Sequence, residues 1–179
     1  GQDILTNTGR IVGNIVFGDG NDTYNGQTGA LKGKVYGDGG NDILRGGADK
    51  DVFYGGAGDD KLYGGTGKDV LAGNAGVDKL YGGADADTFV YSRLSDSTRP
   101  AMDMIMDFAR GDVINLSAID ANAAVAGNQK FAFIGSAAFH GIAGEVRFQT
   151  AGGDSFVYGD VNGDTIADIA IRIDTPTAF

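Results

Sequence analysis

The sequence predicts an all-β protein in which a flattened right-handed coil of short parallel strands is followed by a small antiparallel β region. Three observations predict this fold. An Asp recurs every nine residues from position 42 to position 87, and a large apolar residue follows each Asp two places later. Glycines precede each Asp at fixed offsets, and 32 of the 179 residues are Gly. After residue 91 the glycine period stops, and alternating apolar segments replace it.

The repeated unit is nine residues long, as in Gly-Gly-Ala-Gly-Asp-Asp-Lys-Leu-Tyr at 55–63 and Gly-Gly-Thr-Gly-Lys-Asp-Val-Leu-Ala at 64–72. Glycine at the first, second and fourth positions allows left-handed backbone angles, so the first six residues form a tight turn. The last three form a short strand whose middle side chain points inward. Two units, or 18 residues, therefore complete one turn of the coil and advance it by about 4.8 Å.

Successive turns predict two stacked sheets with different outer faces. We expect the inward residues to be Leu44, Leu62 and Leu80 in one sheet, and Phe53, Leu71 and Phe89 in the other. The outward residues of the second sheet are Val52, Tyr54, Val70, Ala72, Thr88 and Val90, which the C-terminal segment or a partner is expected to cover. Those of the first are Ile43, Arg45, Lys61, Tyr63, Lys79 and Tyr81, which we expect to face water.

Residues 1–36 carry a looser form of the same repeat. Asp3, Asp22 and Asp42 occupy matching places in three similar segments, spaced 19 and then 20 residues apart. We therefore expect the same coil with one or two extra residues per turn, and intermediate strands at 10–12 and 30–32.

The coil also stacks the aspartates in two columns. Carboxylates about 4.8 Å apart repel each other by roughly 1 kcal/mol even in water, so the columns need a cation. No Lys or Arg recurs at a matching position, whereas carboxylate and carbonyl oxygens are the ligands that Ca²⁺ takes. Mg²⁺ demands stricter geometry. Asp and Gly are also ordinary turn formers, but six regular repeats favour the calcium interpretation.

The composition argues against several classes of function. The net charge of −10 argues against nucleic acid and anionic membranes as partners. There is no Cys, and no apolar run approaches the roughly 20 residues of a membrane span. His140 is the only histidine, and no H-E-x-x-H zinc site or nucleophile with a partner His is present. We expect no catalytic site in this chain, and we expect the chain to be part of a larger protein. An enzyme such as a secreted protease, lipase or epimerase is compatible with that expectation.

Residues 37–90 resemble the RTX (hemolysin-type) calcium-binding β-roll of secreted bacterial proteins. The resemblance continues in Ala-Asp-Ala-Asp-Thr-Phe-Val-Tyr at 84–91, Asp-Met-Ile-Met-Asp-Phe at 103–108 and Gly-Asp-Val-Ile-Asn-Leu-Ser-Ala-Ile-Asp at 111–120. These segments are similar to the C-terminal domain of serralysin-type proteases and to the repeat modules of mannuronan epimerases. The resemblance divides the chain into a parallel β-roll at 1–91 and a serralysin-like β cap at 92–179.

The resemblance implies that each calcium ion lies between successive turns of one edge, bound by two Asp carboxylates and by backbone carbonyls. It assigns the carboxylates to Asp42, Asp51, Asp60, Asp69, Asp78 and Asp87, which gives at least four ions. It assigns carbonyls to Asp38, Gly40, Gly46, Gly47, Gly55, Gly56, Ala57, Gly58, Gly64, Gly65, Thr66, Gly67, Gly73, Ala75, Gly82 and Ala84. Further expected ligands are Asp22, Asp96, which lies eighteen residues after Asp78, and Asp107, with Asp103 as an alternative to Asp107. Asp49, Asn74 and Asp85 replace repeat glycines.

The segment after Ser92 predicts a small antiparallel cap that protects the end of the coil. Its expected strands are 104–108, 113–116, 131–134, 145–148, 155–158 and 166–173, with a short helix starting at Ser117. Residues 160–168 allow two interpretations. Their alternating oxygen ligands resemble a calcium loop, whereas Asn162-Gly163 is typical of a two-residue hairpin turn, which we favour.

These observations predict a calcium-binding module that folds on meeting extracellular Ca²⁺. The resemblance implies a secreted, extracellular or cell-surface location, and a C-terminal stabilising role in a larger exported protein. It also implies contact with the type I secretion machinery during export. An alternative function is adhesion or the binding of anionic polysaccharide through the Lys/Tyr face.

Overall fold

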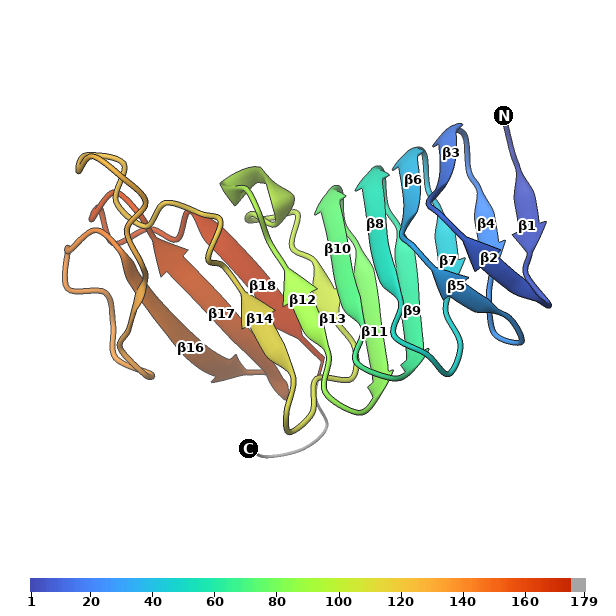
Figure 1. Ribbon diagram of the computed structural model, residues 1–179. Helices are drawn as coiled ribbons and strands as arrows, with labels where there is room; N and C mark the ends of the chain where they lie inside the picture. Colours follow the sequence, from blue (N-terminus) through green and yellow to red (C-terminus); the bar gives the residue numbers. More distant parts are fainter. Residues whose placement is uncertain (175–179) are drawn as a thin grey trace.

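A ten-stranded sheet runs the whole length of the molecule in the computed structural model, which describes residues 1–174 (Figure 1). The chain passes back and forth between this sheet and a second layer, as the sequence predicts. In spatial order its strands are β1 (Ile4–Thr6), β4 (Thr23–Asn25), β7 (Ile43–Arg45), β9 (Lys61–Thr66), β11 (Lys79–Ala84), β13 (Met104–Ile105), β18 (Ile169–Ile173), β17 (Asp154–Asp160), β16 (Glu145–Ala151) and β15 (Ala132–Phe133).

A six-stranded parallel sheet forms the second layer of the coil. Its strands are β3 (Ile15–Asp19), β6 (Val35–Gly39), β8 (Val52–Ala57), β10 (Val70–Ala75), β12 (Thr88–Val90) and β14 (Val113–Asn115). A pair of strands, β2 (Arg10–Val12) and β5 (Ala30–Lys32), forms a third small sheet. The expected intermediate strands are therefore confirmed, and the first two turns have three sides because their extra residues form these strands.

In the regular repeats the core is a stack of large inward side chains, one from each strand. Leu44 pairs with Leu62, and Leu62 with Leu80, across the ten-stranded sheet. On the opposite sheet Phe53 pairs with Leu71, which pairs with Phe89. All six side chains are completely buried. The predicted set of inward residues is therefore confirmed. Side chains alternate between the two faces of a strand, so the middle residue of each short strand points into the core when its neighbours point outward.

Both sheets continue beyond the regular repeats. Asp78 and Asp103 are 25 residues apart, which is seven more than the regular period. The extra residues loop out around the short 3-10 helix η1 (Leu94–Asp96), which lies against β10. β13 then pairs with β11, and β14 pairs with β12, both in parallel.

The C-terminal strands extend the ten-stranded sheet and do not pack on the outer face of the six-stranded sheet. β18 pairs with β13 in parallel, and β17 and β16 follow in antiparallel order. The expectation that the C-terminal segment covers Val52 and Val70 was therefore wrong, and cover by a partner stays a prediction. The open edge of β13 decides the outcome, because its backbone groups find partners in β18. Val52 and Val70 are half-buried, and Ala72 is buried.

Two local expectations were also wrong. Residues 117–120 form a turn and no helix. Two hydrogen bonds close the turn: Ser117 N–H donates to the Asn115 side chain, and Ile119 N–H donates to the Leu116 carbonyl. The strands expected at 104–108 and 166–173 are shorter, at 104–105 and 169–173. Within residues 1–174, no helix has the length and apolar character that crossing a membrane requires.

Candidate metal sites

The aspartates of one edge form a continuous hydrogen-bonded column. In each turn the Asp N–H donates to Oδ1 of the Asp in the next turn: Asp22 to Asp42 and Asp42 to Asp60 at 2.7 Å, and Asp60 to Asp78 at 2.8 Å. Asp78 N–H continues the series to Asp103 Oδ1 at 2.9 Å. We call this the first edge. The bonds fix each carboxylate against the turn before it.

The opposite edge, here the second edge, repeats the pattern over fewer turns. Asp51 N–H donates to Asp69 Oδ1 at 2.8 Å, and Asp69 N–H donates to Asp87 Oδ1 at 2.9 Å. Asp87 N–H donates to Asp112 Oδ1, also at 2.9 Å. The Oδ2 of Asp112 accepts from Ala109 N–H. This edge therefore ends in a carboxylate whose two oxygens both have backbone partners.

The second carboxylate oxygen of most column residues is buried and has no hydrogen-bond partner among the described residues. This holds for Oδ2 of Asp22, Asp42, Asp60, Asp69, Asp78, Asp87 and Asp103. These residues are at most 1 % exposed. An unpaired buried carboxylate oxygen is strongly unfavourable unless it binds a cation or a proton. The columns thus present oxygen ligands directed into the interior of each edge.

Burial also raises the pKa values of the column carboxyls. The pKa of Asp103 rises to about 9, that of Asp60 to about 8, that of Asp69 to about 7 and that of Asp78 to about 6. The main cause is separation from water, and neighbouring carboxylates add to it. Backbone hydrogen bonds oppose the shift but do not cancel it. Without a cation, the edges therefore resist carrying their full negative charge.

First-position glycines create the space beside these oxygens. A Cβ at Gly55 would lie 2.1 Å from Asp60 Oδ2 and 2.8 Å from the Gly73 carbonyl oxygen. A Cβ at Gly64 would lie 2.3 Å from Asp69 Oδ2 and 2.6 Å from Gly82 O. A carboxylate of one turn and a carbonyl of the next therefore converge on a hollow that any larger side chain would fill.

The donors in these hollows fit Ca²⁺. Carboxylate and carbonyl oxygens are hard ligands, and Ca²⁺ accepts six to eight of them in variable geometry. No group of three or more His, Cys, Asp or Glu side chains suited to a metal occurs within residues 1–174. The reason is that each interval between turns supplies two carboxylates, so backbone carbonyls must complete the ligand set.

Three repeat positions without glycine adopt the left-handed backbone of the glycines they replace. Their φ angles are 71° at Asp38 and Asn74 and 79° at Asp85. Asp and Asn tolerate this region better than other residues with a Cβ. Asp49, which also replaces a repeat glycine, is not among the left-handed residues.

Two expected ligands lie elsewhere. Asp96 does not follow Asp78 in the column, because its Oδ2 accepts the N–H groups of Ser92 and Arg93 within its own loop. Asp103 takes that place. Asp107 lies at the second edge, where its two oxygens accept from Gly82 and Gly83.

The sequence did carry a signal for the continuation of both columns. Asp103 and Asp112 are nine residues apart, and each precedes an apolar residue by two places, Ile105 and Ile114. This is the Asp-to-apolar spacing of the repeats. The signal was missed because a 25-residue interval, and not one of 18, connects these residues to Asp78 and Asp87.

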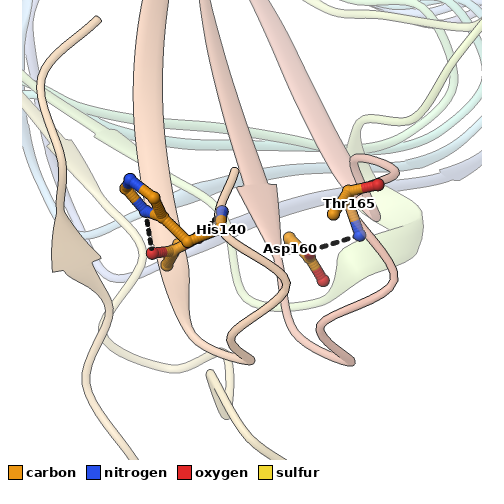
Figure 2. A network of polar contacts seen from close by, with 4 residues as sticks. His140, Asp160 and Thr165 are labelled. Atoms are coloured by element: carbon orange, nitrogen blue, oxygen red, sulfur yellow. Dashed lines mark hydrogen bonds and ion pairs between the residues drawn. The ribbon is translucent and has the colours of Figure 1, made fainter. Parts of the chain in front are cut away.

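The loop at 160–168 joins β17 to β18, which form an antiparallel hairpin. The expected two-residue turn at Asn162-Gly163 was wrong, since the loop spans residues 161–168. Asp160 closes it, accepting from Asn162 and Gly163 N–H at Oδ1 and from Thr165 N–H at Oδ2 (Figure 2). Its buried carboxylate is fully used by backbone donors, unlike those of the columns.

His140 lies near this loop, on the strand-connecting segment before β16 (Figure 2). Its Nδ1 is 2.7 Å from Glu145 Oε1, and its backbone N–H donates to Glu145 Oε2. These contacts lower the pKa of Glu145, chiefly through the backbone bond. The pair closes the turn at 140–145.

We expect replacement of Gly55 by Ala to weaken calcium binding. Gly55 is not left-handed, so the new methyl group acts only by filling the hollow beside Asp60. Overpacking of this size costs about 1–3 kcal/mol, which predicts a fall in apparent affinity of about 5-fold to about 100-fold by calorimetry. Gly9→Ala is the control, because nothing lies within 4 Å of a Cβ there. Equal affinities for the two variants would contradict the hollow as a binding site.

We expect the calcium-free protein to become more stable as the pH falls from about 8 towards about 4. Raised carboxyl pKa values mean that the folded state binds more protons than the unfolded chain in this range. Acidification therefore favours the folded form, opposite to the usual behaviour of paired aspartates. Circular dichroism at pH 8 and pH 5, after removal of metal on a chelating resin, measures the effect as a gain of β structure at the lower pH. Less β structure at pH 5 than at pH 8 would count against it.

Comparisons with known proteins agree with this geometry. Residues 36–71 and 63–96 match the family model of the RTX calcium-binding nonapeptide repeat. A search of curated proteins found no match. Among solved structures, the solution structure of the AlgE6R3 subunit of the mannuronan C5-epimerase from Azotobacter vinelandii is similar. It is 29% identical with a TM-score of 0.52, and the match covers 75% of this chain and 71% of that one.

The matched residues contain the regular part of the two aspartate columns and of the coil that builds them. The segment 36–96 contains all six regularly spaced aspartates, and the structure folds it as a parallel β-roll. The residues that match the RTX calcium-binding nonapeptide repeat are therefore those that place regularly spaced aspartates along both edges of the coil.

Proposed function

We propose that this RTX module folds on binding extracellular Ca²⁺ and stabilises the C-terminal part of a larger exported bacterial protein. The observation that carries the proposal is the set of buried, unpaired Oδ2 atoms along both edges. The Oδ2 atoms of Asp42, Asp60 and Asp69 each lie beside a first-position glycine and close to a carbonyl oxygen of the next turn. Bound Ca²⁺ supplies the positive charge that these oxygens lack.

The protein residues make folding depend on that charge. Burying Asp60, Asp78 and Asp103 side by side is unfavourable without it, as their raised pKa values indicate. A ligand that binds only the folded state shifts folding by RT ln(1 + [Ca²⁺]/Kd) for each site. Extracellular calcium modules have Kd values of about 10⁻⁴–10⁻³ M. The module is therefore unfolded at cytosolic calcium levels and folded outside the cell.

This switch suits export through a narrow channel. A chain with a net charge of −10 and closely spaced aspartates repels itself until a cation arrives, so it stays extended during passage. The type I secretion machinery is the partner that this behaviour fits. The location that follows is extracellular or at the cell surface.

Calcium titration followed by circular dichroism tests the switch. We expect little β structure in calcium-free buffer at pH 7.5, a cooperative gain on adding Ca²⁺ and its loss on adding EGTA. Asp60→Asn should move the midpoint to several-fold higher calcium, because it puts an amide N–H₂ group in place of a ligand oxygen. Asp19→Asn makes the same charge change at an exposed residue and should leave the midpoint unchanged. Full β structure without calcium would refute the proposal.

A second candidate function is the binding of anionic polysaccharide on the outer face of the ten-stranded sheet. Tyr63 and Tyr81 stack there with ring centroids 4.5 Å apart, and the Arg45 guanidinium lies 5.0 Å from the Tyr63 ring. Lys61 and Lys79 are adjacent on the same face. Aromatic rings flanked by cations suit sugar rings that carry carboxylates.

Affinity measurements with a polyuronate, and with dextran as a neutral comparison, test this function. We expect Lys61→Ala with Lys79→Ala to lower polyuronate affinity by about tenfold and to reduce its salt dependence. Lys50→Ala with Lys68→Ala, at exposed turn positions, is the matched control. Unchanged binding by the first double variant would exclude this face.

A further inference from the structure

One repeat, residues 46–51, differs from the other five in how its aspartate is bonded. The Oδ2 atom of Asp51 accepts the Gly47 N–H of its own turn at 2.9 Å. The corresponding oxygen has no partner in any of the other five repeats. Asp51 is buried, at 5 % exposure, and the Gly47 N–H satisfies the oxygen that stays unpaired in the other repeats.

The backbone of this turn takes a different path. In the other repeats the second position is left-handed, with φ from 71° at Asp38 and Asn74 to 123° at Gly56. The fourth position is left-handed as well, from 79° at Asp85 to 147° at Gly76. Neither Gly47 nor Asp49 is among the left-handed residues of the structure. The usual pattern of two reversals is therefore missing from this turn.

The carbonyls of this turn are correspondingly displaced. In the regular turns, each fourth-position glycine lies close to the fourth-position carbonyl of the turn before it. A Cβ at Gly58 would lie 2.2 Å from Gly40 O, and a Cβ at Gly76 would lie 1.9 Å from Gly58 O. At Gly67, which follows the 46–51 turn, the distance to Asp49 O is 2.8 Å. The fourth-position carbonyl that this turn would supply to a site between Asp51 and Asp69 thus lies farther from the next turn than its counterparts do. The carbonyl of the next turn keeps its usual place, since a Cβ at Gly46 would lie 2.2 Å from Gly64 O and 2.3 Å from Asp51 Oδ2. The difference is therefore confined to the 46–51 turn and to the bond that its Oδ2 accepts.

The turns before it on the second edge also close without a carboxylate. Asn7 Oδ1 accepts from Gly9 N–H at 3.0 Å, and Asn7 Nδ2 donates to Ala30 O at 3.1 Å. Asn25 Oδ1 accepts from Gln27 N–H at 3.2 Å. No aspartate therefore stacks on Asp51 from the preceding turn of this edge. The 46–51 turn is the last of a series in which a side chain of the turn bonds backbone groups.

We propose that calcium loads the two edges unequally: the first edge along its whole length from Asp22 to Asp103, and the second edge only from Asp69 onward. This inference rests on the calcium-binding function proposed above. Asp51 serves as a turn-closing residue that holds Gly47, and it is not a metal ligand. The N-terminal half of the second edge is thereby independent of calcium, although its aspartate fits the repeat motif.

Counting bound ions tests the inference. Native mass spectrometry and calorimetry, in saturating calcium, compare the wild type with Asp51→Asn and Asp69→Asn. An Asn at 51 retains an oxygen that can accept the Gly47 N–H, so the turn survives. An Asn at 69 retains the acceptor for Asp51 N–H but places an N–H₂ group where the unpaired oxygen lies.

We expect Asp51→Asn to bind as many ions as the wild type, and Asp69→Asn to bind at least one fewer. Loss of an ion in Asp51→Asn would overturn the inference, and so would its failure to fold in saturating calcium. Should Asp69→Asn fail to fold, Asp87→Asn provides the same comparison on the same edge. A wild type that binds no calcium would instead refute the proposed function, so the two failures are distinguishable.

Discussion

The spacing between stacked turns controls this molecule. Parallel strands bring successive turns to within about 4.8 Å, and the nine-residue period places an aspartate at the same point of every turn. One carboxylate oxygen accepts the N–H of the turn before, while the other remains buried and unpaired. Backbone pairing thus holds like charges together, and the fold needs a compensating cation.

The hydrophobic core alone supports this arrangement only weakly. Each strand of the regular repeats contributes one large inward side chain, such as Leu62 or Phe53, so the core of the coil is a single narrow stack. Such a core offsets little beyond the conformational entropy of its own strands. The buried, unpaired carboxylates oppose this small contribution, which is the physical basis of the proposed coupling between metal binding and folding.

The C-terminal region completes the coil by two different means. It first repeats the pattern, since β13 and β14 continue both sheets, and Asp103 and Asp112 continue both columns. It then adds the antiparallel strands β16–β18 to the ten-stranded sheet. The open edge of β13 is thereby covered, which protects one end of the coil from pairing with other chains.

The sequence by itself determined the coil, the core and the two columns of regularly spaced aspartates. Each of these follows from a local pattern repeated six times, in which a two-residue strand period and fixed turn glycines leave little choice. Only the tertiary structure decided that Asp103, and not Asp96, follows Asp78, and that Asp51 closes its own turn. It also decided where β18 docks. These outcomes depend on which strand edges and backbone donors are available in neighbouring turns, and no single repeat encodes that information.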